Sequence, residues 1–591
     1  MASAVRSALA ARRGAVKFHF VLLFVCILGG SFSRIQAQTA NHQPPSPASH
    51  SDSDFIDTGV EGSTYVPVDN WVYPALDRLH ALGYVDSAYL GLRPWMRLSI
   101  AHMLELSADR IKSDANNDEA LGIYFAVLHE VQPDLDHPTE LLHPHAQLES
   151  VYTQMRGIGG TPLRDSFHLG QTIIDDYGRP YEEGFNNYTG FSARADAGRF
   201  SLYFRGEVQH APSAPGYSAA LSAFLSNNID GIPFATNPHQ DTIPEGPIPT
   251  ANFARIMEAN LSYHLLGHEV SIGKSDHWLG PDQGAAMLWS NNAEDIYDFE
   301  INRIEPIRIP FLSRFTGPFR YDFFVGSLKG HTYPNDPWVH MEKISFKPTR
   351  DLEFGFDRLT IWGGKGHEPI TLHTFLHSFF SFQNVVGAEK ESANDPGARF
   401  GTFDVSYRLP FLRRWVTVYT DSLVHDDVSP ISAPRRSGWH SGIYFARLPG
   451  LEHLDLRVEG ASTNTLSASI QTGQFLYYET IQRQGPTNKG FLVGDWIGRQ
   501  GTGGQAWITY HLSPQENVQF MYRNAKAASD FIPGGTTQND YAIQVCKRIM
   551  KDIEIRGSVQ HEGWKAPIYK SGAQSDTSAA VQITWFPHVW K

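Results

Sequence analysis

The residues of this chain whose types and spacing suggest chemistry gather in one stretch, from Lys274 to Asn292. Sugars present apolar C–H faces and rings of hydroxyl groups, so aromatic rings beside amides and carboxylates suit them. The same composition would also suit an aromatic belt at a membrane interface with asparagine-rich turns. The candidate sugar contacts are Lys274, Asp276, His277, Trp278, Asp282, Trp289, Asn291 and Asn292, and Trp338, Trp362, Lys365 and His367 could line the same mouth.

Signatures of enzymes are weaker. His373 and His377 have the spacing of a two-histidine metal site on a helix, but the residue after His373 is Thr374 and not the glutamate that a zinc protease uses as general base. Histidines on a loop helix beside phenylalanines are the simpler interpretation. We find no nucleophile elbow, phosphate loop or dinucleotide fingerprint in a plausible strand-to-helix context. We therefore expect no catalytic residues, no bound metal and no cofactor.

The rest of the sequence indicates the fold that holds these residues. From about Gln147 onwards, apolar and polar residues alternate with a period of two. In residues 199–209, for example, Phe200, Leu202, Phe204 and Val208 alternate with polar side chains. The same alternation recurs at 352–357, 454–459, 553–560 and 581–585. Strands of about ten residues with one apolar and one polar face are typical of a membrane β-barrel with a polar interior.

The connections between these strands alternate in length. Tight turns such as Ala197–Gly198 and Leu448–Gly450 are separated by long polar loops, at 211–252, 274–298, 363–399 and 462–490. Short turns at one rim and long loops at the other are typical of outer-membrane barrels. The pattern predicts an all-β, antiparallel transmembrane barrel of about 18 strands, with a small α-helical region before it. An empty barrel of that size would leave an aqueous channel.

The chain divides into four predicted parts. Residues 1–37 have the basic start, the short apolar run and the Ala37 cleavage site of a signal peptide. Residues 38–62 are predicted to be a disordered linker, residues 63–146 a helical periplasmic region, and residues 147–591 the barrel in the outer membrane. Cleavage would leave Cys546 alone, so no intramolecular disulfide could form. It would also change the formal net charge from −13 to −18, which excludes nucleic acid as a partner.

At the 274–292 stretch and in its order of elements, the sequence resembles the Wzi family of capsule-assembly outer-membrane proteins. The resemblance implies an eighteen-stranded barrel with a periplasmic helical bundle, acting as a lectin for capsular polysaccharide, with loops and a helix that occlude the pore. The matching residues are Gly273-Lys274-x3-Trp278-x-Gly280-Pro281, Ser290-Asn291-Asn292-Ala293 and Arg303-Ile304-Glu305-Pro306.

A second, local resemblance covers Trp71 to Gly83 and Leu92 to Arg97, which look like half of an S-layer homology module. That module family implies binding of cell-wall polymer. Three such units usually cooperate and one is visible here, so packing under the barrel is the favoured alternative.

The leading hypothesis is a non-enzymatic outer-membrane barrel that binds capsular polysaccharide or exopolysaccharide, with outer-membrane lipid around it. One alternative is a diffusion porin or substrate channel, which lumen-facing Arg199, Arg205, Glu207, Arg457 and Glu459 would suit. Another is a membrane-embedded enzyme acting on lipid or glycan, which would need a base and a nucleophile facing each other at one rim.

Overall fold

The computed structural model describes residues 61–587 except 115–116, 137–143, 236–238, 383–386, 428 and 467–472. The predicted signal peptide and almost all of the predicted linker therefore lie outside the described residues. The described residues of 55–379 and 384–591 form one compact unit, which contains the strands and helices below except for the last residue of α7. No helix in the described part of the chain is long and apolar enough to cross a membrane.

Three helices precede the sheet: α2 (Val72–Ala81), α3 (Arg97–Ser113) and α4 (Asp118–Asp136). Helix α2 ends because Gly83 adopts a positive φ of 90°, which lets the following backbone N–H groups turn back onto the last carbonyl groups. Apolar side chains from all three helices share one core, and Tyr419, Tyr444 and Ala446 of the strand region belong to that core.

Eighteen antiparallel strands form the main sheet of the described residues. Each pairs with its neighbours along the chain, and the last strand pairs with the first over Val151–Gly160 and Asp576–Trp585. The sheet is therefore closed, which confirms the predicted barrel. The strands are β1 (His145–Gly160), β4 (Gly184–Ala197), β5 (Phe200–Ala211), β6 (Ala251–Leu265), β7 (His268–Lys274), β8 (Tyr297–Asn302), β9 (Phe319–Ser327), β10 (Trp338–Thr349), β11 (Leu352–Trp362), β12 (Ala398–Arg408), β13 (Val416–His425), β14 (Gly438–Phe445), β15 (Leu454–Ser462), β18 (Gly501–Ser513), β19 (Glu516–Ala527), β20 (Thr536–Ile549), β21 (Ile553–Ala566) and β22 (Lys570–Trp585).

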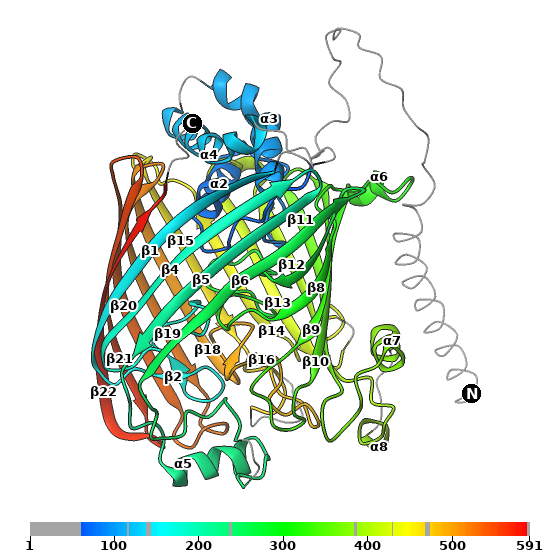
Figure 1. The fold of residues 1–591 in the computed structure, drawn as a ribbon, viewed down its shortest axis with the longest axis vertical. Helices are drawn as coiled ribbons and strands as arrows, with labels where there is room; N and C mark the ends of the chain where they lie inside the picture. Colours follow the sequence, from blue (N-terminus) through cyan, green and yellow to red (C-terminus); the bar gives the residue numbers. More distant parts are fainter. Residues whose placement is uncertain are drawn as a thin grey trace. The chain divides into compact units, whose positions relative to one another are not determined.

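The two ends of the barrel differ, as the connection lengths indicate. At the turn end, connections such as that between β4 and β5 are short, and α2, α3 and α4 lie at this end (Figure 1). At the loop end lie the long connections, which carry α5 (Ala219–Phe224), α7 (Leu372–Phe380) and α8 (Gly387–Lys390) (Figure 1). The remaining short elements are η2 (Leu225–Ile229), α6 (Ser313–Thr316), η3 (Pro410–Leu412), β2 (Arg164–Asp165), β3 (Gly170–Gln171), β16 (Thr487–Asn488) and β17 (Phe491–Leu492).

The alternation of side chains sets which face of each strand is apolar. In β5, Phe200, Leu202 and Val208 are exposed on the outer face, whereas Arg205 and Glu207 are buried inside. Strands β20, β21 and β22 expose apolar residues in the same way, among them Ile543, Val559 and Val581. Because the sheet is closed, it has no unpaired strand edge, and its outer face is apolar. A β-structure in lipid needs both properties.

Candidate functional site

The predicted sugar-contact stretch lies inside the barrel and not at its mouth. Residues 275–296, which connect β7 to β8 and which we call the interior loop, bury almost every side chain. Leu279, Met287 and Trp289 draw the loop inward, because they pack in a cluster with Phe324 of the wall and with Leu92. Leu92 belongs to residues 61–96, which precede α3 and which we call the N-terminal segment. Gly284 permits the close approach, since a Cβ there would lie 2.0 Å from the Gln505 side chain of β18. All eight predicted contacts are at most 7% exposed.

The three of these eight side chains that come first in the sequence bond to neighbouring parts of the protein. The Lys274 Nζ lies 2.5 Å from the Glu294 carboxylate. The Asp276 carboxylate accepts hydrogen bonds from the Val68 N–H, at 2.7 Å, and from the Tyr177 hydroxyl, at 3.0 Å. The His277 ring bonds to the Asp298 carboxylate at 2.9 Å. These contacts fix the start of the interior loop against the wall and the N-terminal segment.

The other five lie deeper in the interior loop. The Asn292 amide donates to the Leu492 carbonyl oxygen at 3.0 Å, and the Asn291 carbonyl accepts from the Tyr177 N–H at 2.7 Å. Trp289 packs edge-on against Phe324, and the backbone of Trp278 pairs with that of Arg93. Both carboxylate oxygens of Asp282 lack a hydrogen-bond partner in the described structure, and burial raises the pKa of this carboxyl well above its usual range.

The interior is filled from both ends. The N-terminal segment enters from the turn end, and its Arg93 exchanges two backbone hydrogen bonds of 3.0 Å with Trp278 of the interior loop. The Glu353 carboxylate of β11 accepts the N–H groups of Leu90 and Gly91. The connection between α2 and α3 therefore meets the interior loop backbone to backbone within the barrel. Occlusion of the pore, which the family resemblance implies, stays a prediction.

Four of the five charged residues that would suit a channel contact other parts of the protein, two of them these inserted segments. Arg205 pairs with Asp69 at 2.7 Å, and Glu207 pairs with Arg179 at 2.6 Å. Glu459 accepts the N–H groups of Gln283 and Gly284. Arg457 is buried against the rings of Tyr419 and Tyr444, whereas Arg199 lies in the β4–β5 turn. Arg205, Glu207, Arg457 and Glu459 are therefore structural contacts inside the barrel.

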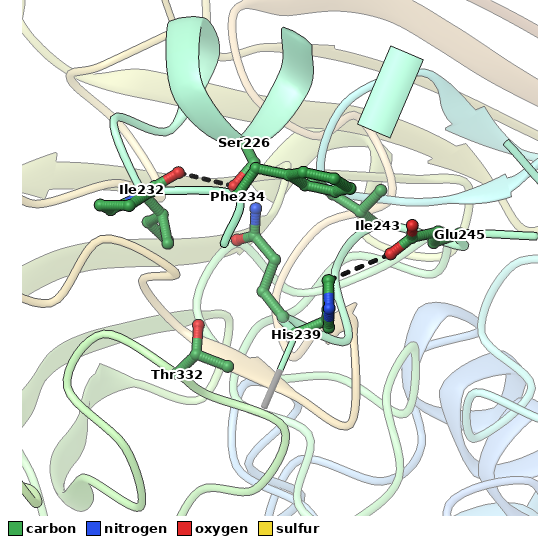
Figure 2. A pocket seen from close by; sticks show the side chains of 9 residues that line it. Ser226, Ile232, Phe234, His239, Ile243, Glu245 and Thr332 are labelled. Carbon is green, nitrogen blue, oxygen red and sulfur yellow. Dashed lines mark hydrogen bonds and ion pairs between the residues drawn. The ribbon is translucent and has the colours of Figure 1, made fainter. Parts of the chain in front are cut away.

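A small hollow opens among the loops at the loop end (Figure 2). The β5–β6 loop forms most of its wall, and Thr332 of the β9–β10 loop completes it (Figure 2). In Figure 2 the Ser226 hydroxyl bonds to the Ile232 carbonyl and the His239 ring pairs with Glu245. The hollow has a volume of about 10 Å³, room for about one water molecule and too little for a sugar ring. The lining residues are Ser226, Ile232, Pro233, Phe234, His239, Gln240, Ile243, Glu245 and Thr332.

Beside this hollow, Tyr333 presents an aromatic ring to solvent. The ring is 40% exposed, and the Arg483 guanidinium lies 4.6 Å from its centroid. Arg483 also donates to the Gly231 carbonyl oxygen, next to Ile232 of the hollow. Lys329 and Lys365, both exposed, share the Asp336 carboxylate on the same loop. We call Tyr333, Arg483, Lys329, Lys365 and the adjoining hollow the loop-end surface.

The β9–β10 loop that carries Tyr333 is firmly held. The Gln484 side chain accepts from the Thr332 N–H at 2.6 Å and donates to the Gly330 carbonyl oxygen at 2.9 Å. His331 bonds to the Thr487 carbonyl at 2.9 Å, and burial lowers the pKa of this histidine to about 4. The ring is therefore neutral at physiological pH. A held backbone presents the exposed ring at little entropic cost, which favours ligand binding.

Of the loop-end surface, only Lys365 was predicted from the sequence. Trp338, which was expected at the mouth, is 36% exposed, whereas Trp362 is buried and His367 bonds to Asp395. Tyr333 stands in a short segment, Thr332-Tyr333-Pro334-Asn335-Asp336-Pro337, whose two prolines signal a rigid loop. That signal could have marked Tyr333 as a held, exposed aromatic residue.

Comparisons with known proteins agree on one family. A family model described as "Capsule assembly protein Wzi" matches residues 153–579. A solved structure from Escherichia coli, described as Wzi, an outer-membrane protein involved in group 1 capsule assembly and a carbohydrate-binding β-barrel, aligns with a TM-score of 0.63 at 15% identity. That alignment covers 89% of this chain and 100% of the other, so the two share a fold.

A curated relative from Klebsiella pneumoniae gives a shorter match. It is described as an uncharacterized 55.8 kDa protein in the cps region and is 24% identical over 161 residues. The match covers 27% of this chain and 31% of that protein, so it spans less than a third of the relative's length.

Proposed function

Because the chain belongs to the Wzi capsule assembly family, we propose that it is an outer-membrane barrel that binds surface polysaccharide during capsule or exopolysaccharide assembly. Binding is its whole role in this proposal, with no catalytic step. The solved Escherichia coli protein of this fold is described as carbohydrate-binding, which favours the same ligand class here.

One observation carries the proposal: the N-terminal segment and the interior loop meet inside the barrel, at Arg93 and Trp278. A barrel filled in this way would give diffusing solutes no route, so we place its interaction with a polymer on an outer surface. The loop end offers the loop-end surface, whereas the turn end is occupied by α2, α3 and α4 (Figure 1). The filled interior therefore favours a binding protein over a diffusion porin.

We place the polysaccharide on the loop-end surface. The exposed face of Tyr333 would stack on the apolar side of a sugar ring, and Arg483 and the lysines would bond to hydroxyl or carboxylate groups. The eight residues predicted from the sequence would act from within, by holding the loops in place. Direct sugar contact by those eight stays a prediction, and it would require the interior loop to move.

Two further partners belong to the proposal. Outer-membrane lipid would cover the apolar outer face of strands such as β5 and β22. Cell-wall polymer binding by the helical region stays a prediction. The residues of the S-layer-like segment have internal partners: Arg93 pairs with Asp77 at 2.9 Å, and Trp95 donates to the Leu92 carbonyl oxygen. Their burial favours a packing role.

The experiment is a comparison of Tyr333→Ala with Phe411→Ala. Phe411 is a fully exposed aromatic residue in η3, in a connection at the turn end, so it matches Tyr333 in type but not in place. We expect Tyr333→Ala to reduce retention of purified capsular polysaccharide by detergent-solubilised protein at least about fivefold, since stacking on an aromatic ring contributes about 1 kcal/mol or more. Phe411→Ala should bind like the wild type.

Heat-modifiable migration on gels, which reports a closed barrel, checks that both variants are folded. Equal retention by folded Tyr333→Ala and wild-type protein would remove the loop-end surface from the proposal. Absence of retention by the wild type, tested across a panel of surface polysaccharides, would overturn the binding function itself.

A further inference from the structure

We propose that His277, Glu300 and Asp322 bind a divalent transition-metal cation inside the barrel. The three residues come from three consecutive parts of the fold: His277 from the interior loop, Glu300 from β8 and Asp322 from β9. One ligand atom from each lies within 4.8 Å of those of the other two. Ligand atoms about 2.0–2.2 Å from a shared ion stand at most about 4.4 Å apart, so a small inward adjustment closes the site.

The unpaired atoms at this place point to a missing cation. The Asp322 carboxylate has no donor other than the neighbouring Glu300 carboxyl, and the buried Nδ1 atom of His277 has no hydrogen-bond partner in the described structure. The residues are 3% and 0% exposed. Two buried carboxyl groups that face each other without a cationic partner are strongly unfavourable, and a bound cation is one way to compensate them.

The side chain of His277 is oriented so that one ring nitrogen can bind a metal ion. Its Nε2 bonds to the Asp298 carboxylate at 2.9 Å, which leaves Nδ1 with the free lone pair when Nε2 carries the proton. The ring stacks on Phe324 with centroids 4.0 Å apart, so its orientation is fixed. A carboxylate that holds the second nitrogen of a ligating histidine is the usual second layer of a protein metal site.

The net charge around the cluster favours binding of a divalent cation. Three carboxylates, those of Asp298, Glu300 and Asp322, face one another and His277 across this part of the interior. The neighbouring Arg320 guanidinium bonds to the Arg303 carbonyl oxygen and to the Asn302 side chain. The Glu300 carboxylate accepts from hydroxyl and amide groups, those of Tyr65, Ser271 and Asn302. Negative charge therefore exceeds positive charge where the three ligand atoms meet.

One imidazole nitrogen and two carboxylates define the class of ion. Zn²⁺ and Mn²⁺ accept this mixed set, whereas Ca²⁺ prefers oxygen ligands alone and in larger number. A bound ion would tie the interior loop, through His277, to two strands of the wall. The site would thus fasten the loop that fills the barrel.

A second cluster, formed by Asp282, His440 and Glu459, has similar spacing and gives a matched control. There, both nitrogens of His440 are engaged, by Asp495 at 2.6 Å and by Glu459 at 3.2 Å. Glu459 also accepts two backbone N–H groups and the Tyr419 hydroxyl. The Asp282 oxygens are unpaired here too, but this cluster lacks a free histidine nitrogen, so we expect it to hold no transition metal.

The test is metal retention by the full chain in detergent. Protein stripped with EDTA is loaded with Zn²⁺, dialysed and analysed by mass spectrometry for bound zinc. We expect about one zinc per wild-type chain, less than a fifth of that in Asp322→Asn and His277→Gln, and wild-type retention in Asp282→Asn. Gel heat-modifiability checks that each barrel is closed.

A second measurement uses the wild type alone, in case the variants misfold. Zinc should raise the thermal midpoint of the stripped protein by several degrees, because a ligand that binds only the folded state stabilises it. Wild-type protein that retains no zinc and shows no shift in midpoint would overturn the site. Equal loss of zinc in folded Asp322→Asn and Asp282→Asn would also overturn the assignment of these ligands.

Discussion

At the scale of single residues, His168 is the buried group whose protonation state has the clearest consequence. Its two ring nitrogens lie 3.0 Å from the Asp165 and Asp230 carboxylates, and Arg499 pairs with Asp230 at 2.7 Å. All four side chains are fully buried. Burial alone would lower the pKa of His168, but the two carboxylates outweigh it and raise the pKa to about 9. The charged ring joins the β2–β3 loop to the end of η2.

This raised pKa predicts how the loops respond to pH. A group whose folded-state pKa is above its unfolded value stabilises the fold fully below the unfolded value, near 6.5, and loses that effect as pH rises through 9. The difference corresponds to roughly 3 kcal/mol of loop stability. Hydrogen exchange of peptides around η2, corrected for intrinsic rates, should show His168→Gln far less protected than wild type at pH 6 and nearly equal to it at pH 9.5. An equal difference at both pH values would contradict the prediction.

The candidate residues show what spacing along the chain can and cannot predict. The stretch from Lys274 to Asn292 was recognisable because its aromatic, amide and acidic groups are unusually dense. The burial of this stretch inside the barrel could not be predicted from the sequence. Burial depends on Phe324, Arg93 and other residues far away in the chain that meet the stretch inside the barrel. Tyr333 and Arg483 are 150 residues apart and pair through tertiary structure alone.

At the scale of elements, the helical region is attached to the barrel by buried ion pairs. The Asp134 carboxylate of α4 pairs with Arg97 of α3 at 3.0 Å and with Arg194 of β4. Helix α2 is held similarly, because Arg78 pairs with Glu119 at 2.6 Å and with Asp455 of β15 at 3.3 Å. These contacts position the N-terminal segment so that it can enter the interior.

Removal of the shared carboxylate should release α4. Asp134→Ala would remove the carboxylate that Arg97 and Arg194 share, leaving Arg97 with Glu149 at 3.3 Å and Arg194 with Asp196 at 3.9 Å. The cost should therefore be smaller than the about 3–5 kcal/mol that complete loss of a partner from a buried pair typically costs. We expect faster hydrogen exchange in α3 and α4 and unchanged exchange in the strands far from them. Glu105→Ala, at an exposed position of α3, is the control. Unchanged protection of α4 in Asp134→Ala would show that apolar packing alone holds it.

Elements were the most predictable level of this protein. Period-two alternation is a local property, so strands such as β5, β11 and β15 follow from the sequence, and β1 begins at His145, two residues before the predicted change of period. Helix α6 and the small hairpins β2–β3 and β16–β17 escaped prediction. Helix α6 has four residues and each strand of these hairpins has two, which is too short for a periodic pattern to show in the sequence.

At the scale of the whole molecule, closure of the sheet and family membership were both foreseen and are confirmed. Closure could be predicted because a sheet of many strands in lipid must have every strand edge paired. Occlusion of the interior was predicted through the family resemblance alone. Periodicity cannot reveal it, because a lumen-facing arginine such as Arg205 looks the same whether it meets water or Asp69.

The filled interior predicts the electrical behaviour of the barrel. An 18-stranded barrel without inserted segments would conduct ions, so the wild-type protein in a planar bilayer should give little or no single-channel current. Deletion of residues 280–292 from the interior loop should open the lumen on one side and raise the conductance at least tenfold. A deletion of similar kind at residues 432–435, in the exposed loop between β13 and β14, should leave the bilayer silent. Large steady currents from the intact wild type would instead restore the channel as the better description, because they would mean that the contact between Arg93 and Trp278 does not block the barrel.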